Sequence, residues 1–194
     1  MDLKRLFATS GVKGLRNYLN SQKKYEVART VIYFLISFSL LAAGWITTGT
    51  RNNLLTIVAV LGCLPACKSL VETIMYCKYH SLSKEEADEV ENHSEGLFCL
   101  YDMIFTSREK TYPVLHLAVC GNTVAGYMPS DKVSEADCAK HLDTCLKVDN
   151  YTNVTIKLYK DFSQYTKRLE QLRQLQAQQD VSAGILNTLK SIAL

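Results

Sequence analysis

The sequence has little excess of charge of either sign. It holds 22 Lys and Arg against 19 Asp and Glu, a formal net charge of +3, which is too small to indicate a nucleic-acid-binding protein. Charged residues make up 21% of the 194 residues and hydrophobic residues 47%. This balance excludes a disordered or fibrous chain, and the length suits one or two domains.

The sequence also lacks the short motifs of several enzyme families. It contains no Gly-x-Ser-x-Gly nucleophile motif, no phosphate-binding loop and no dinucleotide fingerprint. Its seven cysteines are an odd number, which does not suit a disulfide-linked secreted domain. We therefore expect neither a catalytic centre of these types, nor a bound cofactor, nor a disulfide framework.

What the chain does have is two long apolar runs. The first, at 30–48, holds no charged residue, and at about 1.5 Å per residue a helix of this length covers most of a hydrocarbon core about 30 Å thick. The second, at 54–77, contains Lys68 and Glu72 one helical turn apart, so that they can pair. The two runs predict a transmembrane helical hairpin over 30–79.

Basic residues indicate which way this hairpin faces. Residues 1–29 hold seven Lys or Arg, whereas the turn between the runs holds only Arg51. Because positive residues stay inside, we expect both termini in the cytoplasm and Trp45 at the outer interface. The expected location is a bacterial inner (plasma) membrane, with residues 1–29 as a basic amphipathic arm on its anionic inner leaflet.

Small residues recur at helical spacing within the hairpin, and they favour close packing of the two helices. They are Ser39, Ala43, Ala59, Cys63 and Cys67. The alternative is association of several copies into a pore lined by Lys68 and Glu72.

After residue 80 the pattern changes to that of a small α+β domain at 81–162. A Ser83-x-x-Glu86 capping box opens a helix that ends near His93. Strands are predicted at 97–106, 112–120 and 123–128, then a helix at 134–148 and a strand at 154–159. This order predicts a mainly antiparallel sheet.

Amphipathic helices are predicted for residues 163–194. Their apolar residues recur every three or four positions. We expect these helices either to pack against the sheet or to bind a protein partner or a second copy of the chain.

Two Cys-x-x-His pairs are the candidates for a metal site. Cys77 with His80 and Cys138 with His141, together with Cys145, could supply sulfur and nitrogen ligands to zinc. Cys138 and Cys145 also fit the apolar face of their predicted helix, and buried cysteines are common in cores. The core interpretation is the one we expect.

The element order of 85–160 resembles that of the restriction-endonuclease-like core, including its membrane-attached nuclease-related members. A helix carrying Glu91 and Glu95 is followed by three strands, the first with Asp102, and then by a helix and a strand. That family needs a Glu-x-Lys on the next strand to hold Mg²⁺ and activate water. Residues 123–128 hold neither acid nor lysine, so the resemblance implies a degenerate, non-cutting version.

The whole chain, in turn, resembles small two-span membrane proteins of anaerobic Gram-positive bacteria. We expect a membrane-anchored cytoplasmic binding or regulatory module without catalytic activity. The alternatives are an oligomeric channel or transporter accessory subunit and a membrane-tethered nuclease-like enzyme.

Overall fold

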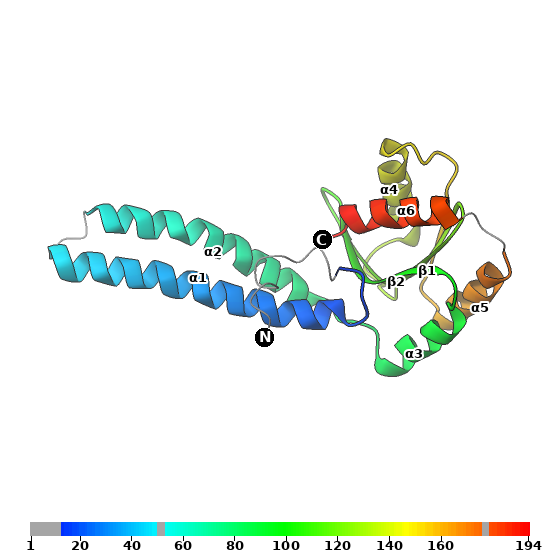
Figure 1. Cartoon of the computed structure of the whole chain (residues 1–194), viewed down its shortest axis with the longest axis horizontal. Coiled ribbons are helices and arrows are strands. Elements are labelled where there is room, and N and C mark those ends of the chain that lie inside the picture. Colours follow the sequence, from blue (N-terminus) through cyan, green and yellow to red (C-terminus); the bar gives the residue numbers. More distant parts are fainter. Residues whose placement is uncertain (1–12, 50–52, 176–178) are drawn as a thin grey trace. The chain divides into compact units, whose positions relative to one another are not determined.

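The computed structural model describes residues 13–49, 53–175 and 179–194. These residues form two compact units. The first is a helical hairpin within residues 19–80, and the second joins residues 13–18 to Ser81–Leu194. Each unit is described by itself (Figure 1).

The hairpin consists of α1 (Tyr18–Thr48) and α2 (Leu54–Lys78). Both helices are long and apolar enough to cross a membrane. Helix α1 begins twelve residues before the predicted apolar run, so residues 18–29 of the predicted arm continue directly into that run. The first twelve residues of the arm lie outside the described residues.

The second unit is an α+β domain built on one four-stranded sheet. Its elements are α3 (Lys84–His93), β1 (Phe98–Thr106), β2 (Thr111–Cys120), β3 (Thr123–Tyr127), α4 (Glu135–Val148), β4 (Thr155–Tyr159), α5 (Phe162–Arg173) and α6 (Gln179–Ile192). Strands β1, β2 and β3 pair antiparallel in sequence order. Helix α4 then carries the chain to β4, which pairs parallel to β3. The predicted α+β fold is confirmed, with a mixed sheet.

Local signals fix where the helices of this domain begin. Ser83 and Glu86 form the predicted capping box of α3. The Ser134 hydroxyl accepts from the Asp137 amide at the start of α4, and the Asp161 carboxylate accepts from the amides of Ser163 and Gln164 at the start of α5. Each cap satisfies amides that a helix leaves unpaired at its first turn.

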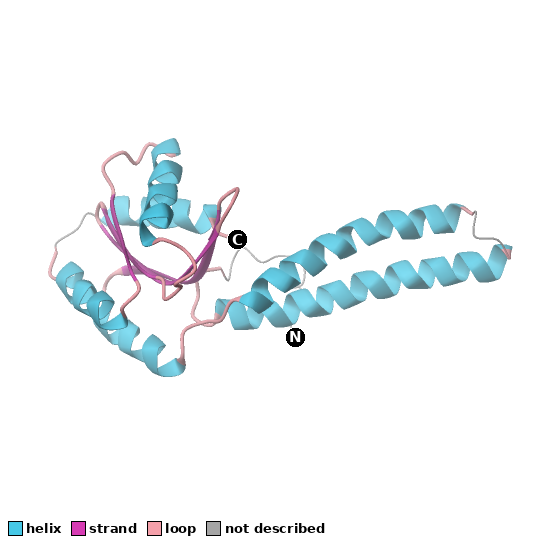
Figure 2. Cartoon of the chain, turned by 180° about the vertical axis from the view of Figure 1, so that it is seen from behind, coloured by secondary structure: helices cyan, strands magenta, loops and turns pink. Residues whose placement is uncertain are grey.

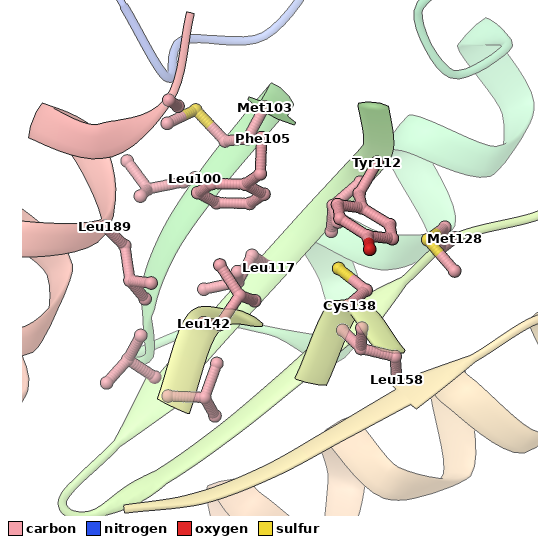
Figure 3. Packing of buried hydrophobic residues seen from close by; sticks show 14 of the residues in the cluster. Leu100, Met103, Phe105, Tyr112, Leu117, Met128, Cys138, Leu142, Leu158 and Leu189 are labelled. Carbon is pink, nitrogen blue, oxygen red and sulfur yellow. The ribbon is translucent and has the colours of Figure 1, made fainter. Parts of the chain in front are cut away.

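Helices cover both faces of the sheet (Figure 2). On one face α4 and α6 pack onto a core that includes Leu117, Leu142 and Leu189 (Figure 3). On the other face α3 and α5 enclose a second cluster around Val90 and Tyr165. The fold is therefore a sheet between two helical layers.

The two C-terminal helices use their apolar faces inside this domain. Leu169 and Leu172 of α5 are fully buried in the second cluster, and Ile185 and Leu189 of α6 are fully buried in the first. Of the apolar residues that the sequence aligns on these faces, Leu175 is more than half exposed. These apolar faces therefore pack against the chain's own sheet, which is one of the two alternatives stated for them above.

Leu142 tests this packing because its side chain is fully buried between α4 and the sheet. Replacing it by alanine leaves a cavity, so we expect Leu142→Ala to lower the free energy of unfolding by about 2–5 kcal/mol. Thermal unfolding of the full chain in mild detergent measures the loss. Lys140→Ala, exposed on the same helix, is expected to change stability by less than about 0.5 kcal/mol. Equal effects of the two changes would contradict the packing.

Candidate functional site

The interior of the hairpin contains several polar side chains beside small apolar ones. Thr30 Oγ1 lies 2.8 Å from Ser69 Oγ and 3.0 Å from Thr73 Oγ1, which joins the two helices by hydroxyl hydrogen bonds. In the middle of the hairpin, Ser37 faces Gly62, where a Cβ would lie only 2.9 Å from the Ser37 hydroxyl. Small and hydroxyl-bearing residues therefore allow the helices to approach closely along this seam.

Near the start of α1 the seam becomes a chain of charged groups. Glu26 is 2% exposed and accepts from Gln22 Nε2 at 2.9 Å and from Arg29 Nη1 at 2.7 Å. Arg29 lies 4.0 Å from Glu72, which lies 3.8 Å from Lys68. The charges alternate in sign across the two helices, so each carboxylate has a cation beside it.

Asn53 closes the other end of the hairpin. Its side chain accepts from the Thr56 amide as the N-cap of α2, and its Nδ2 donates to Gly44 O and Thr48 Oγ1, both at 2.7 Å. A Cβ at Gly44 would lie 2.9 Å from Asn53 Oδ1. This role was not predicted, because an Asn in a polar turn gives no sequence signal that it reaches back to the preceding helix.

The three membrane-related residues predicted from sequence are all on the hairpin. Lys68 and Glu72 form the expected ion pair, with Lys68 80% exposed. Trp45 is exposed on α1, near the hairpin turn. Glu72 also extends the pair across to Arg29, a contact that the spacing of charges along α2 alone does not reveal.

The prediction of which small residues line the contact between the two helices is only partly correct. Ala59 is buried and Cys63 is half-buried, whereas Ser39, Ala43 and Cys67 face outward. The Ser39 hydroxyl donates to Leu35 O of its own helix at 2.7 Å. The seam on α1 instead runs through Thr30, Ser37 and Gly44, because the helix presents these positions, not the equally small neighbours, to α2.

In the α+β domain, the chain segments that flank the hairpin both attach to strand β1. The Tyr101 amide donates to Gly14 O at 2.9 Å, and Ser81 Oγ donates to Asp102 Oδ2 at 2.6 Å. Arg16 holds α3 through ion pairs with Asp88 at 2.5 Å and Glu91 at 2.9 Å. Segment 13–18 and Ser81 therefore meet at one pair of adjacent β1 residues.

Two of the three described residues other than glycine that have a positive φ lie at this junction. Asp102 has φ +56° and Asn17 has φ +59°, a left-handed conformation that costs roughly 1–3 kcal/mol for residues other than glycine. Gly14, at φ +84°, adopts it freely. The buried Asp102 carboxylate and its bond from Ser81 help to hold the strained strand in place.

The three acidic residues on which the nuclease resemblance rests each have a different structural partner. Asp102 accepts a hydrogen bond from Ser81, Glu91 is paired with Arg16, and Glu95, which precedes β1, lies 3.5 Å from Arg173. Strand β3 brings no carboxylate or lysine beside them. Within the described part of the chain, no three His, Cys, Asp or Glu side chains gather as metal ligands.

The metal candidates of α4 are divided between core and surface. Cys138 of α4 is fully buried in the core, and burial raises the pKa of its thiol to about 12. His141 Nε2 lies 3.9 Å from Cys145 Sγ, and its ring stacks on Tyr112 at a centroid distance of 5.9 Å. The core interpretation fits Cys138, while His141 borders an open polar groove with Lys110 and Asp137.

His116 is a buried titratable residue that the sequence did not single out. Its ring is fully buried on β2, and Nδ1 lies 2.5 Å from the Tyr165 hydroxyl. Tyr101 packs edge-on at 4.5 Å between centroids. Burial lowers the pKa of His116 to about 3, so the ring is neutral and acts as a structural hydrogen-bonding group.

No family model, curated protein or solved structure matches the chain. Its function is therefore inferred from its residues and their geometry alone.

The seam predicts which positions a disulfide can join. Cysteines at 30 and 69 replace two hydroxyls 2.8 Å apart, so Thr30→Cys with Ser69→Cys is expected to oxidise within one chain. The pair is introduced with Cys63, Cys67 and Cys77 replaced by serine, and mass spectrometry of proteolytic fragments detects the link.

A matched pair, Val31→Cys with Leu70→Cys, moves both thiols to outward-facing positions. It is expected to remain reduced under the same oxidant. Crosslinking of the outward pair, or none for the seam pair, would contradict this helix register.

His116 makes the stability of the domain depend on pH. The pKa of His116 is lowered in the folded state. Below pH 6.5, this histidine therefore becomes protonated in the unfolded chain while it stays neutral in the folded chain. The contribution of His116 to the free energy of unfolding therefore has its largest value above pH 6.5. As the pH falls from 6.5 towards 3, it decreases by up to about 1.4 kcal/mol per pH unit. Unfolding of the full chain across this range measures the slope.

His116→Phe is expected to flatten that slope, although it lowers stability at neutral pH by leaving the Tyr165 hydroxyl without its partner. His80→Gln, at an exposed histidine, is the control and keeps the wild-type slope. Parallel curves for wild type and His116→Phe would show that His116 is not the responsible group.

Proposed function

We propose that the chain is an integral membrane protein. In this proposal α1 and α2 cross the bilayer as a hairpin, and the α+β domain is a binding or regulatory module on the cytoplasmic side. The observation that carries the proposal is the distribution of polarity in the hairpin, which buries polar and small residues while its large aliphatic residues are exposed.

Buried polar residues and exposed aliphatic residues of the hairpin illustrate this distribution. Gln22, Glu26 and Thr30 are buried, and Thr30 lies within hydrogen-bonding distance of Ser69 and Thr73 of α2. In contrast, Leu35 and Leu54 are exposed, and Ile46 is 83% exposed. In water, a stable helix pair buries its leucines and leaves glutamate outside, and a continuous apolar surface of this kind promotes aggregation. Lipid removes the conflict, because it surrounds the apolar side chains and strengthens the need for internal polar partners.

Charge distribution supports the proposed orientation. Seven basic residues precede residue 30, and the hairpin turn holds only Arg51. Lys23 and Lys24 remain available to anionic headgroups at the start of α1, because no ion pair of theirs occurs among the described residues. Lys13 bonds to Ala193 O, and Arg16 pairs with α3, so these two cations serve the α+β domain instead.

The roles of the chemistry-bearing groups favour binding over catalysis. His116 is bonded to Tyr165 inside the core, Asp102 is held by Ser81 at a strained strand position, and Cys138 of α4 is buried in the core. Each of these groups stabilises the domain in its present place. We infer that the domain acts by recognising a ligand or partner on its surface.

Membrane extraction and protease access test this proposal. Membranes from cells that express the chain are washed with alkaline carbonate, and the chain is expected to stay in the pellet. Protease added outside intact cells is expected to leave residues 81–194 whole, and permeabilised cells are expected to lose them. Release by carbonate would exclude the spanning hairpin, and cleavage in intact cells would exclude the cytoplasmic orientation.

A further inference from the structure

Strand β4 is an edge of the sheet, and only one of its sides has a strand partner. The Thr155 amide donates to the residue before β3, and Tyr159 O accepts from the residue after β3, both at 2.8 Å. Backbone N–H and C=O groups of successive residues point to opposite sides of a strand. The backbone groups of Ile156 and Leu158 therefore point away from β3, to the outer side of the sheet.

The two edges of the sheet differ in how the chain covers them. Strand β1 is bonded on its outer side by Gly14 O and by the Leu194 amide. Among the residues that the structure describes, none forms a hydrogen bond of this kind with the outer side of β4. Of the features that protect sheet edges from pairing, β4 has its short length and one lysine, Lys157.

Lys157 lies at the centre of this edge and limits which strand can pair there. Its side chain and that of Thr155 are exposed, and no ion pair of Lys157 occurs within the described ranges of the chain. The nearby Lys160 has a carboxylate at 3.8 Å, that of Asp131, which is itself 97% exposed. The edge therefore has a positive charge that an acidic partner can neutralise.

The same lysine disfavours a second copy of the chain as the partner. An antiparallel pair of β4 strands that used all the outward backbone groups of both copies would place the two Lys157 side chains directly opposite each other. Like charges in that position destabilise a strand pair, whereas opposite charges stabilise it. A strand with an acidic residue opposite Lys157 would form an ion pair there.

We propose that the outer side of β4 binds an extended peptide segment of a protein partner, which adds a fifth strand to the sheet. An acidic residue of the segment would lie opposite Lys157, between two apolar residues opposite Ile156 and Leu158. Antiparallel pairing is the more stable arrangement per residue. Ile156 is half-buried beside the core under α4, so the apolar residues of the segment would extend that core.

This inference gives the binding module of the proposed function a class of partner, and it rests on that function. Peptide binding is measured on the full chain in mild detergent, where membrane insertion has no part. Failure of the peptide to bind is therefore distinguishable from failure of the chain to stay in carbonate-washed membranes.

Fluorescence anisotropy of a labelled peptide tests the edge. The probe is Ser-Thr-Val-Glu-Val-Thr-Ser, whose glutamate can face Lys157. In antiparallel pairing the N–H groups of its two valines bond to β4, and the N–H group of its glutamate points away. N-methylation of both valines is therefore expected to abolish binding, whereas N-methylation of the glutamate retains it.

Reversal of one charge tests the preference for an acidic partner. Lys157→Glu is expected to weaken binding of the probe about fivefold or more, and to favour the peptide that has lysine in place of glutamate. Arg108→Glu, at an exposed cation in the turn between β1 and β2, is the matched control and keeps the affinity of the wild type.

The proposal is overturned if the probe does not bind below about 1 mM, if N-methylation of the valines and of the glutamate has the same effect, or if Lys157→Glu and Arg108→Glu bind the probe alike. Affinity that falls as the concentration of the chain rises would show that a second copy occupies the edge, and it would overturn the proposal as well.

Discussion

Hydrogen bonds between polar side chains inside a helix pair dominate the structure of the hairpin. Thr30 joins α1 to Ser69 and Thr73 of α2, and Glu26 is held by Gln22 and Arg29. Such bonds add little to stability in water, where each group can bond to solvent instead. In hydrocarbon they are the only partners available. In the proposed bilayer setting, where lipid surrounds the exposed leucines and isoleucines, these contacts have no competition from water.

Strand β1 has the corresponding role in the α+β domain. As the first strand of the sheet it has one side without a strand partner, which exposes backbone groups to unwanted pairing. Gly14 O accepts from Tyr101 at one point, and Ile104 O accepts from the Leu194 amide at another. Segments from both ends of the described chain thus cover this edge, and the strained Asp102 lies between them. Strand β1 is thus both an edge of the sheet and the strand to which Gly14 and Ser81, on either side of the hairpin in the sequence, are hydrogen-bonded.

Sequence periodicity and caps were enough to place most elements. Ser83, Ser134 and Asp161 cap their helices as their types suggest. Strands β1, β2 and β3 are mostly buried along their length, because helices cover both faces of the sheet. Contacts between distant segments were beyond the same reasoning. Nothing local places β4 parallel to β3, makes Asn53 reach back to Gly44 or buries His116 against Tyr165. Spacing identified two polar residues of the hairpin but not the seam, since which helix face meets its partner depends on packing.

The single tryptophan provides the most direct test of the central claim, that lipid surrounds the hairpin. Trp45 is exposed on α1 near the hairpin turn, where an aromatic side chain suits the membrane interface. Fluorescence of the full chain is measured in bilayers of brominated lipids. We expect quenching by bromines placed high on the acyl chains and weaker quenching by bromines near the bilayer centre. Fluorescence that brominated lipids leave unchanged, and that aqueous iodide quenches fully, would contradict the spanning hairpin.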